Sequence, residues 1–425
     1  MARQFQGDQT ERTVLLGGVG VVLAVVMILI VRLFTNDNGS ATADSSAEGA
    51  EDAEPNVQSG TVLQDLTQGV AVGGEDGEAL KDGPIEPAAT NVPMEKLKAG
   101  DKPPQFIIFS FDGGAGDDNW QRFLEAAEVH DARFTTFLTG LYLLGDEAKE
   151  AAVYDPPGHS PGAASIGYGG SQESIVTQVE NLNTAYSRGH EIGTHYNGHF
   201  CAGSPPSGND WTAQDWDDEL DQFFTMMTDW KELNGYTDVP DLRVPAETVK
   251  GGRTPCLEGK WEELAPAWKA HDLTYDSSIP APASGVSWPE LRDGIWEFYM
   301  PYAYSPAFGM TTVMDYNFWI QFNGGVSEPE TAPELREDVR ETYDYLYEQV
   351  YNGNRAPLLV AGHFNSWNGD SFNPPTADFM RETCGEPETY CATYQDVMAW
   401  MEFQDPTVLE EILTQPPVAD SESSD

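Results

Sequence analysis

Basic residues are scarce in this sequence of 425 residues. Only 22 Lys and Arg stand against 70 Asp and Glu, which gives a formal net charge of −48. A surface this acidic repels phosphate backbones and anionic lipid headgroups, so the composition argues against nucleic-acid partners and against electrostatic docking on a membrane. Hydrophobic residues still make up 40% of the chain, which is enough for a substantial core and excludes a wholly disordered protein.

One long apolar run stands near the N-terminus, at residues 14–34, interrupted only by Arg32. Its length just suffices for a transmembrane helix. Two arginines precede it, and the next basic residue after Arg32 is Lys81. The positive-inside rule therefore predicts a cytoplasmic N-terminus (1–13), a single-pass signal anchor in the plasma membrane (14–34) and an extracellular remainder. The alternative is a signal peptide cleaved near residues 41–43, which would give a secreted protein.

Acidic, low-complexity composition indicates two disordered segments. Residues 36–80 contain ten Asp and Glu and no Lys or Arg, and the C-terminal end is acidic and proline-containing. Such segments cannot bury enough apolar surface to offset the entropy of ordering. We expect an acidic disordered linker at 35–103, one large folded domain at 104–403, and an acidic disordered tail at 404–425.

The chain has only four cysteines, none of them in a Cys-x-x-Cys pair, which argues against a cysteine metal centre. In an exported protein they indicate two disulfides, with three possible pairings. Cys384 and Cys391 flank a short turn, so we expect them to pair with each other and Cys201 to pair with Cys256. Four buried thiols are the alternative.

Within the domain, apolar runs of strand length alternate with segments of helical periodicity. Strands are predicted at 105–111, 134–138, 190–195 and 357–362, and helices at 120–129, 174–187, 215–233 and 338–350. Buried strands alternating with helices indicate a parallel α/β sheet, and the length of the domain predicts that this sheet forms a barrel. Asp112, His195 and His363 stand at strand ends, where such barrels place their active sites.

The strongest chemical signal is the pair His195 and His199. Three of the seven histidines of the chain lie within residues 189–200. Two histidines four residues apart can bind one metal ion from the same side of a turn. The pair therefore predicts a divalent-metal site.

The order of these motifs resembles that of the polysaccharide deacetylases, the NodB-like enzymes that remove N- or O-acetyl groups from chitin, peptidoglycan and related glycans. The matching positions are Asp112 at the end of an apolar strand, His195-x-x-x-His199, Arg253-Thr-Pro255, and His363 at the end of a later strand. The resemblance covers about residues 104–400 and is closest to exported actinobacterial members with a Ser-Phe-Asp-Gly first motif. It implies an irregular (β/α)7 barrel.

The resemblance also implies a role for each residue. His195 and His199 would bind a divalent ion, Zn2+ or Co2+, that polarises the acetyl carbonyl and activates a water molecule. Asp112 would be the general base or a metal ligand, Arg253 would orient the base, and His363 would protonate the leaving group.

The first motif departs from the family pattern. The family carries two adjacent aspartates, the base and then a metal ligand, whereas here Asp112 is followed by Gly113. Direct alignment makes Asp112 the base and leaves the metal without its carboxylate. A shift by one residue makes Asp112 the ligand and leaves no base. Asp117 or Asp118 is the alternative source of the missing oxygen.

The function predicted from the sequence is a membrane-anchored, extracellular, metal-dependent deacetylase acting on peptidoglycan or another acetylated polysaccharide. Two alternatives stay open. One is a catalytically inactive glycan-binding protein with the same fold, and the other is an amidohydrolase acting on a non-sugar amide.

Overall fold

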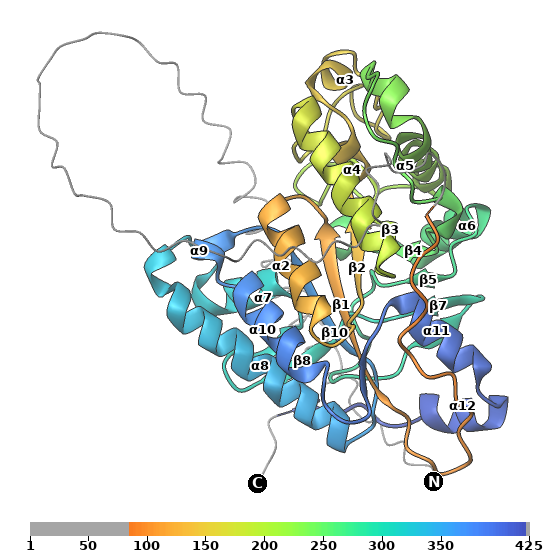
Figure 1. Ribbon diagram of the computed structural model, residues 1–425, viewed down its shortest axis with the longest axis vertical. Helices are drawn as coiled ribbons and strands as arrows, with labels where there is room; N and C mark the ends of the chain where they lie inside the picture. The colour runs from red at the N-terminus through yellow and green to blue at the C-terminus, as the bar shows by residue number, and fades with distance from the viewer. Residues whose placement is uncertain (1–84, 422–425) are drawn as a thin grey trace, which may run out of the picture.

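The computed structural model describes residues 85–421, and its centre is a sheet of mostly parallel strands (Figure 1). One inner strand of the sheet is β1 (Gln105–Gly113), all nine residues of which are buried. A strand covered on both faces is typical of parallel α/β sheets, and it explains the unbroken apolar run in the sequence. β1 lies between β10 (Leu358–His363) and β2 (Phe134–Leu138).

The sheet has the strand order β10-β1-β2-β3-β4-β5-β7-β6, and β11 pairs with the beginning of β1. All neighbours are parallel except β6 and β7. The remaining strands are β3 (Glu191–Thr194), β4 (Gly251–Gly252), β5 (Tyr275–Asp276), β6 (Glu290–Arg292), β7 (Ile295–Glu297) and β11 (Thr389–Cys391), with a separate hairpin of β8 (Tyr302–Ser305) and β9 (Gly309–Thr312).

Isolated contacts, rather than a regular strand, link the two ends of the curled sheet. Met314 forms a parallel bridge with Ala361 of β10, and the amide of Val313 donates to the carbonyl of Pro301 at 2.9 Å. The predicted α/β class is confirmed. Of the predicted irregular (β/α)7 barrel the structure shows a curled half-barrel sheet, because β4 and β5 are two residues long and regular pairing ends at β6.

Helices surround the sheet, with α10 packed between α2 and α8 and α5 packed on α6 (Figure 1). Their bounds are α2 (Asp117–Glu128), α3 (Asp146–Glu150), α4 (Gln172–Ser187), α5 (Ala213–Asn234), α6 (Trp261–Ala270), α7 (Asp315–Asn323), α8 (Ala332–Asn352), α9 (Trp367–Asp370), α10 (Asn373–Thr383), α11 (Tyr394–Phe403) and α12 (Pro406–Leu413). The predicted helices near 120–129, 174–187, 215–233 and 338–350 correspond to α2, α4, α5 and α8.

Local signals define the ends of α5, the longest of these helices. Thr212 and Asp215 form a capping box at its start, and Gly235 ends it in the left-handed conformation with φ 68°. Buried Trp, Leu, Phe and Met side chains cover one side of the helix. This amphipathic helix brings Glu219 against the loop that carries the two histidines of the predicted metal site.

The disordered tail predicted for residues 404–425 is wrong for most of its length. α12 begins at Pro406, where the Asp405 side chain accepts a hydrogen bond from the amide of Thr407 at 3.0 Å. Val408 and Ile412 are buried on the domain. The acidic composition reflects the solvent side of this helix and does not prevent it from packing.

The predicted linker also ends earlier than the composition indicated. Residues 85–103 are described, and they run along the domain in extended form. The amide of Ala88 donates to the carbonyl of Ser187 at 3.1 Å, and Val92 is buried. The predicted cytoplasmic segment (1–13), membrane anchor (14–34) and remaining linker (35–84) lie outside the described residues. Within residues 85–421, no helix has the length and apolarity needed to cross a bilayer.

Candidate active site

A cavity of about 220 Å³ opens where β1, β3 and β10 end. In the register of the sheet Asp112 lies beside His363, and His195 directly follows β3. All three side chains line the cavity together with His199. The other walls come from loops, from the end of β9 and from the first turns of α7 and α9. The rest of the lining is Gly113, Thr139, Tyr142, Ile166, Cys201, Ala202, Cys256, Leu257, Glu258, Pro280, Thr312, Met314, Tyr316, Asn317, Asn365 and Trp367.

A buried ion pair joins Asp112 to Arg253. The Nη1 atom of Arg253 donates to Oδ1 of Asp112 at 2.8 Å, and the Arg253 side chain is fully buried. Its other donors reach Ser277, Ser110 and the hydroxyl of Tyr394, so the guanidinium is satisfied. Burial raises the pKa of Asp112, but the Arg253 charge, followed by the nearby histidines, outweighs it and leaves that pKa below its ordinary value.

His363 is paired with Asp315, a residue that the sequence analysis missed. The Nδ1 atom of His363 lies 2.9 Å from Oδ1 of Asp315, whose Oδ2 accepts the His363 amide at 2.8 Å. Burial lowers the pKa of His363, but the Asp315 charge and its hydrogen bond outweigh that effect and hold the pKa above its ordinary value. Nε2 of His363 is left facing Oδ2 of Asp112 at 4.0 Å, a distance that one water molecule can bridge.

His195 and His199 lie beside each other, with their ring centroids 5.3 Å apart. Nδ1 of His195 contacts the carbonyl oxygen of Arg253 at 2.8 Å, which places the proton on Nδ1 and leaves Nε2 unprotonated. Burial lowers the pKa of His195 and lowers that of His199 to about 3. Both imidazoles are therefore neutral at physiological pH, as metal ligands must be.

A buried carboxylate shapes the loop between these two histidines. Oε1 of Glu219 accepts the amides of Asn197 at 3.1 Å and Gly198 at 3.2 Å, and the hydroxyl of Tyr154 donates to the same carboxylate at 2.9 Å. Burial raises the pKa of Glu219 to about 7. In the sequence Glu219 is one acidic residue among several of an amphipathic helix, so no local signal distinguishes it.

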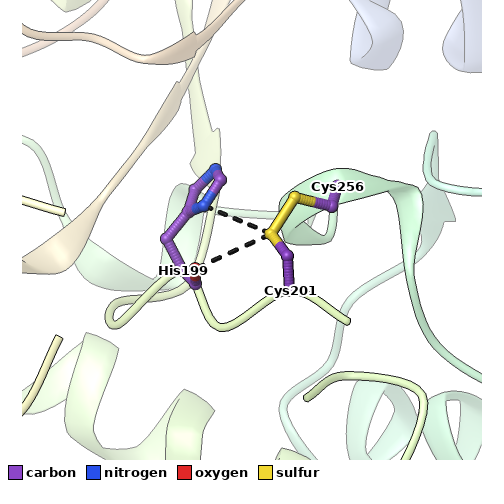
Figure 2. A group of neighbouring side chains, drawn as sticks. All are labelled: His199, Cys201 and Cys256. Carbon is purple, nitrogen blue, oxygen red and sulfur yellow. Dashed lines mark hydrogen bonds between the residues drawn. A yellow bond between two sulfur atoms is a disulfide. The ribbon is translucent and has the colours of Figure 1, made fainter. Parts of the chain in front are cut away.

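Both predicted disulfides are present, Cys201–Cys256 and Cys384–Cys391. The first forms part of the cavity wall, and Sγ of Cys201 lies 3.5 Å from Nδ1 of His199 (Figure 2). It joins the loop of His199 to the loop that follows Arg253. The bridge therefore fixes one predicted metal ligand relative to the residue that holds Asp112.

Gly113 occupies a conformation that favours glycine, with φ +81°. A Cβ atom at this position would lie 3.2 Å from Cε2 and 3.6 Å from the hydroxyl oxygen of Tyr142. The ring of Tyr142 therefore fills the space into which a side chain at position 113 would point. A tyrosine from another element therefore lies beside the position at which the resemblance expects a second carboxylate.

The donor set fits a divalent ion only in part. His195 and His199 supply two neutral nitrogens to one cavity, whereas Asp112 is engaged by Arg253. Within residues 85–421, the one group of three ligand-type side chains whose donor atoms lie within 4.8 Å of one another is His199, Cys201 and Cys256. Its sulfurs are joined in a disulfide and are not thiolates. The described residues thus offer two of the three expected protein ligands.

Other candidate residues lie elsewhere. Asp117 accepts hydrogen bonds from Asn181 and Gln121 outside the cavity wall, and Asp118 is exposed at the start of α2, so neither replaces the missing carboxylate. Asp276 is buried and accepts a hydrogen bond from the amide of Ser278 at 3.1 Å, which makes it a loop-capping residue.

An aromatic face in the cavity could stack on a sugar ring, and Trp367 lines the cavity with its ring 4.9 Å from that of His363. Trp288 and Trp296 are buried in the core. His190 is also buried and stacks on Phe134, so it belongs to the core and not to the cavity.

Comparison with known proteins gives similarity at the level of solved structures. No family model matches the sequence, and no curated protein matches it significantly. A protein of Mycobacterium smegmatis described as a polysaccharide deacetylase shares 15% identity over 80% of this chain and 100% of its own, with a TM-score of 0.42. A family 4 carbohydrate esterase of Streptomyces lividans in complex with acetate shares 12% identity over 68% of this chain and 91% of its own, with a TM-score of 0.33. A family 4 pseudoenzyme of Bacillus anthracis shares 12% identity over 70% of this chain and 71% of its own, with a TM-score of 0.34. These identities and TM-scores do not show that this chain belongs to the family of these proteins, so its function is inferred from the residues of the cavity.

Proposed function

We propose that this protein is a hydrolase that removes acetyl groups from an acetylated glycan. The observation that carries the proposal is that the Asp112–Arg253 pair and the His363–Asp315 pair meet in one cavity. Arg253 keeps Asp112 ionised, Asp315 raises the pKa of His363, and 4.0 Å separates Asp112 Oδ2 from His363 Nε2. A carboxylate base and a histidine acid at this separation can serve the two proton transfers of amide or ester hydrolysis.

The reaction would proceed as a water attack on the acetyl carbonyl. Asp112 accepts a proton from the water as its oxygen bonds to the carbonyl carbon. His363 then donates its Nε2 proton to the leaving nitrogen or oxygen as the bond from the carbonyl carbon breaks. The products are acetate and a free amine or hydroxyl on the sugar. Arg253 lowers the basicity of Asp112, so this base works best on a water that is already acidified.

His195 and His199 are the residues that would hold a divalent ion in this site. A bound zinc or cobalt ion would polarise the carbonyl and lower the pKa of the water, which compensates for a weak base. With two protein ligands instead of three, we expect weaker metal retention than a complete site gives. The metal identity and the extracellular, membrane-anchored location remain part of the proposal.

The cavity favours a neutral acetylated sugar over an anionic ligand. Its described lining contains Asp112 and Glu258 but no Lys or Arg, because Arg253 lies behind the wall and is satisfied by its own partners. The ring of Trp367 lies beside His363 in the cavity lining and offers an aromatic face to a sugar ring. These features support an acetylated glycan substrate better than an anionic small amide.

A serine esterase is the alternative hydrolase, because residues 158–162 read Gly-His-Ser-Pro-Gly. The nucleophile of such enzymes sits on a tight turn between a strand and a helix. Here Ser160 is exposed in a loop with neither element beside it, and it does not line the cavity. The second alternative, an inactive glycan-binding protein, is not favoured, since binding alone does not require the Asp315–His363 pair.

The test is acetate release by purified protein spanning residues 85–425, with metal content measured on the same sample. Probes are the N-acetylglucosamine tetramer, peptidoglycan and acetylated xylan, each with and without added zinc or cobalt. We expect acetate release that is lost in Asp112→Asn and in His363→Ala, and metal content that falls in His195→Ala. Metal binding without acetate release from any probe would refute the hydrolase and favour the glycan-binding alternative.

A further inference from the structure

Tyr142 is the residue of the cavity that neither the motif order nor the acid–base dyads account for. It belongs to a short 3₁₀ helix (Gly140–Leu143) that directly follows β2. The flanking Leu141 and Leu143 are fully buried, so the backbone that carries Tyr142 is anchored in the core. Its own side chain turns to the cavity and lies against Gly113.

The hydroxyl of Tyr142 is placed for a ligand rather than for the fold. Tyr142 is half-buried in the cavity wall, and among residues 85–421 no side chain or backbone group forms a hydrogen bond with its hydroxyl, which is therefore open to a ligand. The hydroxyl oxygen lies 3.6 Å from where a Cβ atom of residue 113 would stand, and residue 113 directly follows Asp112. Burial raises the pKa of Tyr142, so the phenol keeps its proton and can donate a hydrogen bond.

We propose that Tyr142 is a catalytic residue, whose hydroxyl donates a hydrogen bond to the carbonyl oxygen of the acetyl group and to the oxyanion that develops from it. This inference rests on the proposed hydrolase. Hydrolysis needs a donor to the carbonyl oxygen near the attacking water, and Tyr142 lines the same cavity as Asp112 and His363 and lies against Gly113, the residue that follows Asp112. A preorganised donor at this place replaces part of the electrophilic assistance that an incompletely ligated metal would supply.

The reason for Gly113 follows from the same geometry. Any side chain at that position would contact the tyrosine ring, at 3.2 Å for the first carbon alone. The glycine therefore leaves room for Tyr142 to reach the reacting centre. The glycine at position 113 and the unpaired hydroxyl of Tyr142 therefore belong to the same part of the cavity wall.

Tyr142→Phe tests the proposal, because it removes only the hydroxyl. Since that hydroxyl has no partner in the described fold, the variant should melt at the temperature of the wild type. We expect kcat for acetate release from the N-acetylglucosamine tetramer to fall about 10²-fold, with KM nearly unchanged. Tyr347→Phe is the matched control, since its hydroxyl contacts Thr389 far from the cavity, and its kcat should equal that of the wild type.

The outcomes separate this inference from the proposed function. An unchanged kcat in Tyr142→Phe overturns the role of Tyr142 while leaving the hydrolase intact. If the wild type binds the tetramer but releases no acetate, the hydrolase fails, and calorimetric affinity becomes the readout. A Tyr142→Phe affinity about five- to tenfold weaker then supports the hydrogen bond to the acetyl group, and an unchanged affinity overturns it. A wild type that neither binds nor hydrolyses any of the three probes overturns both.

Discussion

Replacement of Arg253 by Met should destabilise the domain severely. The guanidinium is fully buried and donates hydrogen bonds to Asp112, Ser277, Ser110 and Tyr394 at 2.8 to 3.1 Å. Removing one partner of a buried ion pair leaves the other charge uncompensated, which typically costs about 3–5 kcal/mol. A domain with about 5–15 kcal/mol of total stability would lose a large share of it.

A double-mutant cycle in urea unfolding isolates the pair. Asp112→Asn removes the charge but keeps an oxygen that accepts from Arg253, so this single change should cost less than Arg253→Met. In the double variant no uncompensated carboxylate remains, and the loss should be smaller than the sum of the single losses by about 1.5–3 kcal/mol. Arg381→Met is the control, because Arg381 forms a largely exposed pair with Asp378 that is worth about 0–1 kcal/mol. A cost below about 1 kcal/mol for Arg253→Met, or strict additivity in the cycle, would contradict the assignment of this pair.

Three further predictions concern pH, redox state and buried acids. Asp315→Asn removes the charge that raises the pKa of His363, so the alkaline limb of the activity profile should move to lower pH, and an unmoved limb would disprove the pairing. Cys201→Ser opens a loop of 55 residues, so it should lower the free energy of unfolding by about 4 kcal/mol and should reduce metal content. Full metal content in this variant would show that the bridge does not fix His199. Cys384→Ser is the control and should leave metal content unchanged. Glu297 lies beside Asp276 in the β5–β7 register, and burial raises the pKa of both, that of Asp276 to about 6. Their folded forms hold protons more tightly than the unfolded chain, so stability is present at acidic pH and is lost as pH rises from 3.8 through about 6. Glu297→Gln should therefore gain stability over the wild type at neutral pH but not at acidic pH in urea unfolding, and an equal difference at both would rule out the titration.

The parts of the fold that the sequence predicted are those with strong local patterns. β1 and β10 are continuous apolar runs ended by a polar residue, and such runs form buried parallel strands wherever the chain places them. β4 and β5, at two residues each, leave no periodicity to detect, and the irregular closure of the sheet depends on them. The tail containing α12 was mistaken for disorder because composition does not show which side of a short helix packs.

The residues of the candidate site likewise fall into those that a sequence pattern identifies and those that only the fold brings to the site. Asp112 and His363 end predictable strands and could be identified from that position. Asp315 begins a helix 48 residues before His363 in the chain, and only the folded structure brings the two together. Glu219 and Tyr142 likewise reach the site from α5 and from the turn after β2. Residues that position or assist a catalytic group come from distant elements, so their roles have no local spacing to reveal them.

Restoration of the family carboxylate tests whether the site is built around its absence. Gly113→Asp introduces a side chain at φ +81° and 3.2 Å from the ring of Tyr142, so the single variant should lose about 1 kcal/mol of stability and should not retain more metal. Gly113→Asp combined with Tyr142→Ala removes the obstructing ring, and zinc should then bind more tightly because a third protein ligand can reach the ion beside His195 and His199. Tyr142→Ala alone is the control, and it should leave zinc affinity at the wild-type level. If Gly113→Asp alone bound zinc fully at unchanged stability, Tyr142 would not block the ligand position. Gly113 would then be a lost ligand that Tyr142 does not require.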